Sequence, residues 1–374
     1  MGNKNDIKVL AFYLPQYHPI KENNVWFGEG FTEWTNVGKA QPLFKGHYQP
    51  RVPADLGYYD LRIPEVRKKQ AELAKEAGIS AFCYYHYWFG NGRQIMEMPL
   101  NEVVRTGEPD FPFCICWANH SFFRKSWNPQ TNILNKELLL EQTYPNDEDI
   151  IEHFKSLLPA FRDNRYFKID GKLVFMIYNI SAIPDFQRFK SIWKDLSNEY
   201  GLPGFFYIGY TTKKEEINNL LDQCDAVNLE LLHNTNINSY GFISNIRRRI
   251  FSVIGYFLKR PMFVKDYAEY IHNLVDPIEK SDRIIPQIIP NWDWSPRRGA
   301  AGLILHNSTP KNFQHHVEDV IKLLKNKPSN RKLIFLKSWN EWGEGNYLEP
   351  DLKFGKGYIK ALKSALDKSA NSNQ

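Results

Sequence analysis

The chain has 374 residues, of which 43% are hydrophobic and 15% aromatic, and its 48 basic and 42 acidic side chains leave a net charge of +6. This hydrophobic content is ample for a large packed core. Such a mild charge excess permits attraction to anionic glycans or lipid headgroups but does not indicate nucleic acid as a partner. The sequence contains no RNA- or DNA-binding motif.

The amino-terminal segment 1–6 is polar and leads directly into an apolar run, so the sequence predicts no signal peptide. No apolar run is long enough to span a bilayer. The four cysteines each lie in or beside an apolar run, and their spacing fits neither a zinc site nor a disulfide framework. We therefore expect buried thiols in a protein of the reducing cytoplasm.

Eight short apolar runs recur along the chain, and helical patterns lie between several of them. The runs cover 9–14, 81–85, 113–117, 173–178, 205–210, 226–231, 284–289 and 333–336, and the helical patterns cover 64–77, 147–161, 186–200 and 313–326. Continuous rather than alternating hydrophobicity indicates strands buried on both faces, and alternation with helices indicates parallel pairing. An open doubly wound sheet would carry a glycine-rich phosphate loop after its first strand, and this chain has none. The sequence predicts a single α/β domain over 1–374, a (β/α)8 TIM barrel.

Two long insertions and a polar tail interrupt this pattern. The first βα connection, about 18–60, is long for a compact domain, and we expect it to form a cleft wall or to plug the barrel mouth. The second insertion, about 234–282, contains an apolar stretch with basic flanks at 247–260. Such a stretch suits peripheral contact with a membrane, and the alternative is an ordinary helix packed on the barrel. The tail from about 368 is expected to be frayed.

The segment 338–345, directly after the eighth run, places two glutamates among two tryptophans and two glycines. Glycosidic bonds are broken by pairs of carboxyl groups, one of which protonates the leaving oxygen. Indole faces suit the faces of sugar rings, and glycines let the backbone approach a ligand closely. We predict that Glu341 and Glu344 are the catalytic residues.

Aromatic, amide, imidazole and carboxylate side chains follow almost every predicted strand, at the end of a barrel where active sites form. A single residue of these types more often has a structural role, but together they predict a polar, aromatic cup for a sugar. The residues expected to bind substrate are Tyr13, Gln16, His18, Trp34, His86, Trp88, Trp117, Asn119, Tyr178, Glu230, Asn291, Trp292, Asp293, Asn340 and Trp342.

No metal site and no cofactor are expected. A nucleotide-sugar transferase of the common metal-dependent kind would carry an Asp-x-Asp string at a strand end. The only such string, Asp147-Glu148-Asp149, falls at the start of a helical pattern, where acidic residues complement the helix dipole.

The strand-eight motif, 338–345 followed by Leu348-Glu349-Pro350, resembles that of the endo-α-mannosidases of glycoside hydrolase family ninety-nine. Over nearly its full length the chain resembles the WbsX-type proteins of bacterial lipopolysaccharide and capsule gene clusters, with hallmarks at 11–19, 30–34 and 292–293. The resemblance implies a retaining enzyme acting on an oligo- or polysaccharide of the cell surface. It also implies that Glu341 assists the sugar's own 2-hydroxyl, and that Glu344, with a raised pKa, protonates the leaving oxygen.

Two other functions fit the same sequence. WbsX-type proteins are commonly described as glycosyltransferases, so a nucleotide-sugar-dependent transferase of lipopolysaccharide biosynthesis is one alternative. A non-catalytic glycan-binding protein that keeps the cup is the other. Hydrolysis and transfer to a carbohydrate acceptor would use the same two glutamates.

Overall fold

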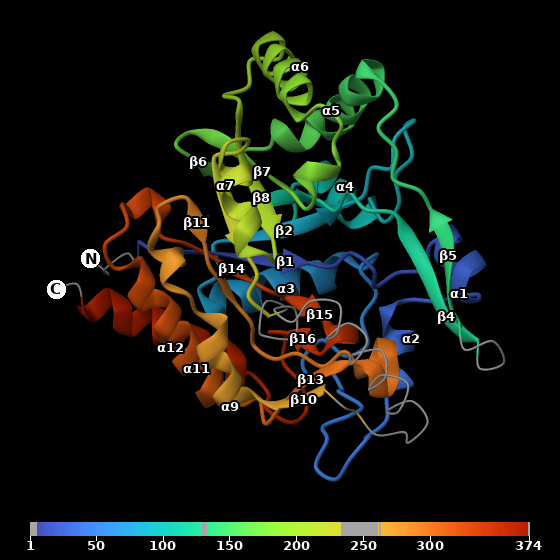
Figure 1. Cartoon of the computed structure of the whole chain (residues 1–374), viewed down its shortest axis with the longest axis vertical. Coiled ribbons are helices and arrows are strands. Elements are labelled where there is room, and N and C mark those ends of the chain that lie inside the picture. Colours follow the sequence, from blue (N-terminus) through green and yellow to red (C-terminus); the bar gives the residue numbers. More distant parts are fainter. Residues whose placement is uncertain (1–5, 129–132, 233–260, 262, 373–374) are drawn as a thin grey trace.

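A closed barrel of parallel strands forms the centre of the protein (Figure 1). The computed structural model describes residues 6–128, 133–232, 261 and 263–372. Neighbouring strands of the barrel all pair in parallel. In barrel order they are β1 (Lys8–Tyr13), β2 (Ala81–His86), β3 (Phe113–Trp117), β7 (Lys172–Ile177), β8 (Phe205–Thr211), β9 (Ala226–Leu229), β11 (Ile284–Ile285) with β12 (Gln287–Ile288), and β14 (Leu333–Leu336).

One segment closes the barrel by pairing on both sides. β11 pairs with β9, and β12, two residues further on, pairs with β14. Pro286 separates the two pieces because proline has no backbone N–H for the ladder. Its carbonyl still accepts a hydrogen bond from the N–H of Phe335 at 3.0 Å. The predicted run 284–289 is therefore one bent strand, and the eight predicted strands all occur.

Helices cover the outside of the barrel, and α11 and α12 pack side by side (Figure 1). The covering helices are α3 (Pro64–Ala77), α4 (Met98–Thr106), α5 (Asp147–Phe161), α6 (Phe186–Glu199), α7 (Ile217–Leu221), α11 (Pro310–Leu324) and α12 (Gly357–Ser372). The side chain of Asn146 caps α5 by accepting the N–H of Asp149, so the acidic string lies at a helix start as predicted. α12 packs on α11 and extends to Ser372, past the position 368 at which the sequence predicts the start of a frayed tail.

The insertions contain short elements that the apolar pattern did not predict. The first holds α1 (Lys21–Phe27) and α2 (Glu33–Gly38), and an antiparallel hairpin of β4 (Phe122–Asn128) and β5 (Ile133–Leu140) follows β3 (Figure 1). Further elements are β6 (Lys168–Ile169), β10 (Phe263–Asp266), α9 (Tyr267–Tyr270), α10 (Ser295–Arg298), β13 (Leu303–His306), β15 (Asn340–Glu341), β16 (Asn346–Tyr347) and the 3-10 turns Ile180–Ala182, Lys214–Glu216, Ile271–Leu274, Pro277–Lys280, Gly299–Ala301, Ser329–Arg331 and Trp342–Glu344.

The segment 247–260, predicted to contact a membrane or to pack on the barrel, lies outside the described residues. Within the described ranges, the helices are all too short or too polar to cross a bilayer. The described part of the second insertion begins with β10, which pairs in parallel with β13.

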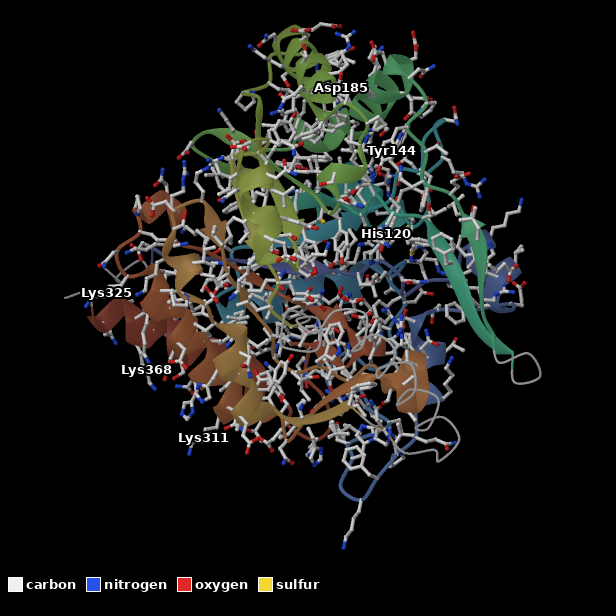
Figure 2. The ribbon with its side chains drawn as sticks, viewed as in Figure 1. His120, Tyr144, Asp185, Lys311, Lys325 and Lys368 are labelled. Carbon is white, nitrogen blue, oxygen red and sulfur yellow. The ribbon has the colours of Figure 1, made fainter. Side chains whose placement is uncertain are left out.

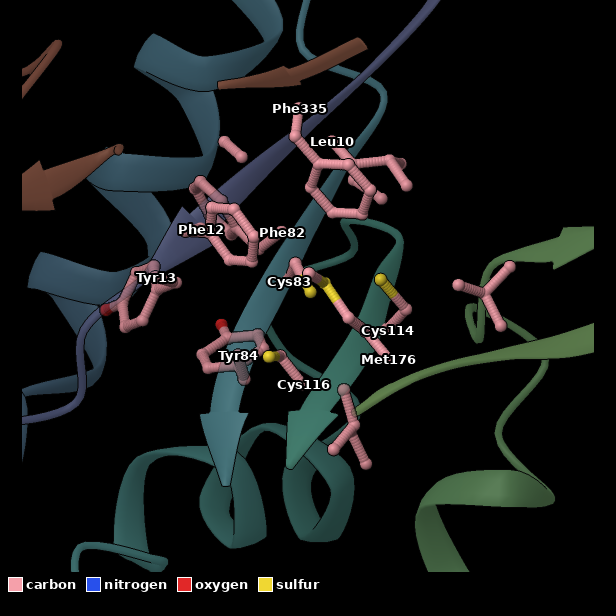
Figure 3. Packing of buried hydrophobic residues seen from close by; sticks show 14 of the residues in the cluster. Leu10, Phe12, Tyr13, Phe82, Cys83, Tyr84, Cys114, Cys116, Met176 and Phe335 are labelled. Carbon is pink, nitrogen blue, oxygen red and sulfur yellow. The ribbon is translucent and has the colours of Figure 1, made fainter. Parts of the chain in front are cut away.

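Large aromatic and sulfur-containing side chains pack together in the hydrophobic core on and around the barrel strands (Figure 3). The ring of Phe12 stacks on Tyr85 and on Phe335, with centroids 5.3 and 4.9 Å apart. All four cysteines are buried and free, as the spacing predicted. A core packed in this way holds the strand ends rigidly, which is what a site built from several strands needs.

Candidate active site

The turn after β14 carries both predicted catalytic glutamates to the carboxyl end of the barrel. β15 and β16 pair in antiparallel fashion, and the 3-10 turn Trp342–Glu344 joins them. The side chain of Ser338 fixes this turn, since its hydroxyl donates to the carbonyl of Asn346 at 2.7 Å and accepts the N–H of Glu341 at 2.9 Å. Glu341 and Glu344 are 8% and 9% exposed, so they lie at the bottom of the site, within reach of a ligand.

The two glycines of the turn allow buried protein groups to approach the backbone. A β-carbon added to Gly343 would lie 1.9 Å from Oε1 of Glu33. One added to Gly345, whose φ is +58°, would lie 2.7 Å from Cβ of Asp293. The sequence predicted close approach of a ligand at these glycines, and in the structure carboxylate side chains make that approach.

Arg297, on α10, connects the two glutamates. Its Nη1 lies 2.5 Å from Oε1 of Glu344 and 3.3 Å from Oε1 of Glu341, and its Nε donates to Oε1 of Glu33 at 2.9 Å. The Arg297 side chain is 24% exposed, whereas that of Glu33 is 2% exposed. Because one nitrogen contacts both Oε1 atoms, these atoms lie closer together than the roughly 6.5–9.5 Å separation of inverting glycosidases.

The ionisation of the site differs from one carboxyl to the next. Burial, and then the neighbouring charge of Glu344, raise the pKa of Glu341 to about 8. Burial acts in the same direction on Glu33, but Arg297 outweighs it and lowers the pKa of that carboxyl. The raised pKa of Glu341 was not among the properties that the resemblance implied.

A second buried ion pair lies next to the glutamates. Nζ of Lys337, the residue that follows β14, contacts Oε2 of Glu230, which also accepts the hydroxyl of Tyr210. Burial opposes the charge on Lys337, but Glu230 raises the Lys337 pKa well above its usual value. Nζ of Lys337 also lies 5.6 Å from the ring centre of the buried Trp292. The Glu230 carboxylate and the Trp292 ring therefore surround Lys337 below the site.

Aromatic rings form a wall beside the glutamates. Tyr178 stacks on Tyr210 with centroids 4.3 Å apart, and the exposed ring of His120 lies 5.5 Å from that of Tyr178. Burial raises the pKa of the half-buried Tyr85, and the charge of Glu341 adds to that shift. Figure 2 shows His120 near the centre of the molecule, away from Lys325 and Lys368 at the outer helices. Of the predicted binding residues, Tyr178 contributes its ring to this wall.

Trp342 and Trp34 support the catalytic turn from behind. The Trp342 indole N–H donates to Oε2 of Glu349 at 2.6 Å, and its ring stacks on Tyr347 at 3.6 Å. The Trp34 indole N–H donates to the carbonyl of Tyr59 at 2.7 Å, and its ring lies 5.6 Å from Trp342. Trp342 is 1% exposed, so its indole packs the turn, whereas Trp34 is half-buried.

Asn340 joins the first and last strands of the barrel. Its Oδ1 accepts the N–H of Leu14 at 2.7 Å, and its Nδ2 donates to the Leu14 carbonyl at 3.0 Å. The residue is fully buried, so the structure uses its amide to hold strand ends together.

Asn291 and Asp293 hold the other side of the turn. The guanidinium of Arg51 contacts Oδ1 of Asn291 and donates to the carbonyl of Gly345 at 3.1 Å. Asp293 accepts from Nε2 of His47 at 2.8 Å, and its own N–H donates to the carbonyl of Glu344 at 2.7 Å. Both predicted residues are fully buried and position the glutamates through the backbone.

His86, Trp88 and Trp117 lie outside the cup, in a buried cluster around His153 of α5. Nε2 of His86 lies 3.0 Å from Nε2 of His153, and the Trp88 ring stacks on His153 at 4.8 Å. The Trp117 indole N–H donates to the carbonyl of Trp88 at 3.0 Å. Burial lowers the pKa of His86 to about 3, which keeps the cluster neutral. The last residues of β2 and β3 thus point outward, toward the helices.

Four other predicted binding residues also have structural partners. The Tyr13 hydroxyl donates to Gln70 of α3 at 2.6 Å, and burial lowers the pKa of His18 to about 4. The backbone carbonyl of Gln16 accepts the N–H of Glu33 at 3.0 Å, which fixes the start of α2. The Asn119 side chain donates to the backbone carbonyl of Asn179 at 2.7 Å and accepts the backbone N–H of Asn179 at 2.8 Å.

The predicted set left out three residues that surround the glutamates: Arg297, Glu33 and Lys337. Arg297 and Glu33 are 264 positions apart, and no local pattern in the sequence pairs them. Lys337 directly follows an apolar strand, and this position was the available signal. No group of three or more His, Cys, Asp or Glu side chains suited to a metal ion occurs in the described part of the chain.

The fold and this site define a (β/α)8 barrel protein with an acidic pair at the carboxyl end of its last strand. The chain belongs to the family described as glycosyltransferase WbsX, whose family model matches residues 9–362. It is 32% identical over 367 residues to the uncharacterized protein WxcX of two strains of Xanthomonas campestris pv. campestris. The match covers 96% of this chain and 50% of the relative, so the chain spans about half the length of these relatives.

Solved structures with the same fold include a glycoside hydrolase-like protein and an endo-alpha-mannosidase. A glycoside hydrolase-like protein has a TM-score of 0.57 at 18% identity, over 98% of this chain and 95% of that one. The GH99 endo-alpha-mannosidase from Bacteroides thetaiotaomicron has a TM-score of 0.53 at 17% identity, over 97% and 98%. At these identities the likeness concerns the fold, and it confirms the predicted TIM barrel.

Proposed function

We propose that this chain is a carbohydrate-active enzyme that acts on a glycosidic bond of a bacterial surface oligo- or polysaccharide through Glu341 and Glu344. The observation that carries the proposal is the contact of Arg297 Nη1 with both carboxylates at the carboxyl end of the barrel. Two carboxyl groups that share one arginine nitrogen lie close enough to act on one glycosidic bond, the kind of bond that pairs of carboxyl groups break.

In the proposed reaction, the oxygen of the sugar's 2-hydroxyl attacks the anomeric carbon while Glu341 takes its proton. The bond to the leaving oxygen breaks as Glu344 donates a proton to that oxygen, and an anhydro sugar results. Water or a carbohydrate hydroxyl then attacks the anomeric carbon and gives its proton to Glu344, while the bond from that carbon to the 2-oxygen breaks and Glu341 returns its proton to the 2-oxygen. Hydrolysis and transfer therefore share both glutamates, and each acid–base step contributes about 10²–10⁴-fold in rate.

The wall of Tyr85, Tyr178 and His120 supports a sugar ring next to the glutamates. Tyr85 and Tyr178 are half-buried and His120 is exposed, so ring faces are accessible beside the pair. Aromatic faces bind the apolar faces of sugars while leaving the hydroxyls to polar groups. We propose these three rings as substrate contacts, together with the exposed edge of Arg297.

A panel of oligosaccharides, including mannosides, tests the proposal. The protein is incubated with each glycan beside Glu344→Gln and Glu341→Gln, and products are followed by mass spectrometry. We expect turnover of at least one glycan by the parent protein and a loss of about 10²-fold or more in each variant. Unchanged turnover in Glu344→Gln would contradict the assignment of the acid. Sugar binding without any product would favour the glycan-binding alternative.

A nucleotide-sugar donor is disfavoured by the charges around the pair. Among the described residues here, Arg297 is held by Glu33 and both glutamates, and Lys337 is held by Glu230. A diphosphate would have to displace a carboxylate to reach either cation. Ligands that bind the folded state raise its melting temperature, so a nucleoside diphosphate should shift it less than a cleaved oligosaccharide does. The reverse order would favour the transferase.

A further inference from the structure

Arg297 contacts the two proposed catalytic carboxyls unequally. Its Nη1 lies 2.5 Å from Glu344 and 3.3 Å from Glu341, a difference that favours negative charge on Glu344. Neighbouring carboxyl groups oppose each other's ionisation, so a proton bound by the pair belongs to both. The position of Arg297 therefore bears on where that proton sits.

Glu33 fixes the position of Arg297. It accepts from Nε of Arg297 at 2.9 Å and from Nδ2 of Asn36 at 2.9 Å, and it packs against Gly343 of the catalytic turn. The Glu33 side chain is 2% exposed, whereas that of Arg297 is 24% exposed. An entering sugar can therefore reach Arg297 while its Glu33 anchor remains covered.

We propose that Arg297, anchored by Glu33, is a positioning residue that sets which of Glu341 and Glu344 holds the shared proton. In the ligand-free protein its close contact keeps Glu344 ionised and leaves the proton on Glu341. A sugar hydroxyl that takes over the Arg297 contact lets the proton pass from Glu341 to Glu344, where the leaving oxygen needs it. This proposal rests on the proposed function for the roles of the two glutamates, and on geometry alone for the resting state.

The other groups that face the pair are fixed in the same structure. The raised pKa of Glu341 agrees with a resting proton on that residue. The titratable and charged groups around the pair are Arg297, Glu33, Lys337, Glu230, Tyr85, Tyr87 and Tyr178. Lys337 remains bound to Glu230, so Arg297 is the partly exposed cation in this set that a ligand reaches first.

Titration of the free protein tests the proposal without any substrate. Glutamate side-chain carboxyls are labelled with carbon-13, the signals of the pair are assigned with Glu341→Gln and Glu344→Gln, and both are followed between pH 4 and 10. We expect the Glu341 signal to titrate near pH 8 in the parent protein. In Arg297→Met the apparent pKa of the pair should rise by at least about 1, with the proton divided between both carboxyls. Arg297→Lys should restore part of the difference between the two carboxyls. Glu33→Gln should raise the apparent pKa of the pair as Arg297→Met does, but by less.

Arg298→Met is the matched control, since this neighbouring guanidinium lies 3.8 Å over the ring of Trp294. It should leave the titration of Glu341 unchanged. Identical titrations in the parent and Arg297→Met, with melting temperatures that show both are folded, would overturn the inference. Failure of every glycan to turn over would overturn the proposed function and leave the titration result standing.

Discussion

The carboxylate of Glu33 fills the space beside the α-carbon of Gly343. A β-carbon at that position would lie 1.9 Å from Glu33 Oε1 and 3.1 Å from Arg297 Nε. Glu33, which lies in the first βα connection, therefore packs directly against the turn after the last strand while it binds Arg297, and a side chain at position 343 would interfere with that packing. A β-carbon on Gly345, the second glycine of the turn, would likewise lie too close to Asp293, at 2.7 Å from its Cβ.

Gly343→Ala should destabilise the protein and disturb the site together. The methyl group must displace Glu33, an overpacking change that typically costs about 1–3 kcal/mol of unfolding free energy. Urea unfolding measures this loss. Gly38→Ala is the control, because at this last residue of α2 an added β-carbon meets nothing within 4 Å. That variant should be neutral or slightly stabilising, and equal losses in the two variants would contradict the steric explanation.

Lys337→Met should be costly because it leaves the buried charge of Glu230 without its cation. Removing one partner of a buried ion pair typically costs about 3–5 kcal/mol. The double variant Lys337→Met with Glu230→Gln removes the uncompensated charge, so it should recover part of that loss in urea unfolding. Additive losses in the double variant would show that the two side chains are not energetically coupled.

Glu349→Gln should weaken the dependence of stability on pH. Burial raises the pKa of Glu349 from its ordinary value near 4.5 to about 7. The folded protein thus holds this proton more tightly than the unfolded chain does. The resulting stability is complete below about pH 4.5 and is lost as the pH rises through 7. At about 1.36 kcal/mol per pKa unit, the loss amounts to roughly 3 kcal/mol.

Urea unfolding at intervals from pH 4.5 to 8.5 checks this prediction. The variant should lose less stability than the parent over the range, while the exposed Glu65→Gln should follow the parent. The pKa values of Glu341 and Glu279 are both raised to about 8. These two residues therefore maintain part of the loss of stability with rising pH in the parent and in both variants. A slope in Glu349→Gln equal to that of the parent would contradict the assignment.

Asn119→Ala separates a structural role from the substrate-binding role predicted from sequence. The amide bridges both backbone groups of Asn179, and its loss leaves them unpaired, at a cost of about 1–3 kcal/mol. We expect a lower melting temperature with little change in the affinity for a glycan. His120→Ala, one residue further on, should do the opposite, because its ring is exposed at the site. Weaker glycan binding in Asn119→Ala at unchanged stability would restore the sequence-based assignment.

The strands of the barrel were predictable because each one is a local property of the chain. A run such as 333–336 is buried on both faces of a parallel sheet, and that environment demands continuous apolar residues wherever the partner strands come from. The sequence did not predict the break between β11 and β12 at Pro286. A proline inside an apolar run still allows one bent strand to pair on both sides.

The direction of each polar side chain was decided by the tertiary structure. His86 and Trp117 end β2 and β3, and Trp88 follows β2, yet all three point toward α5, since neighbouring residues at a strand end face opposite sides of the sheet. Tyr178 points to the aromatic wall beside the glutamates, and Asn340 ties two strands together. The position of a residue after a strand therefore did not distinguish a side chain that faces the site from one that supports the fold.

By itself, the sequence determined the barrel, its family and the placement of Glu341 and Glu344 on one turn, because strand burial and a contiguous motif are written in adjacent residues. The partners of that turn were decided only by folding. Arg297, on α10, contacts Glu33, which lies 264 positions earlier in the sequence. Such a contact depends on how eight strands close and where their loops converge, and charge at a site follows from distances that no local pattern contains.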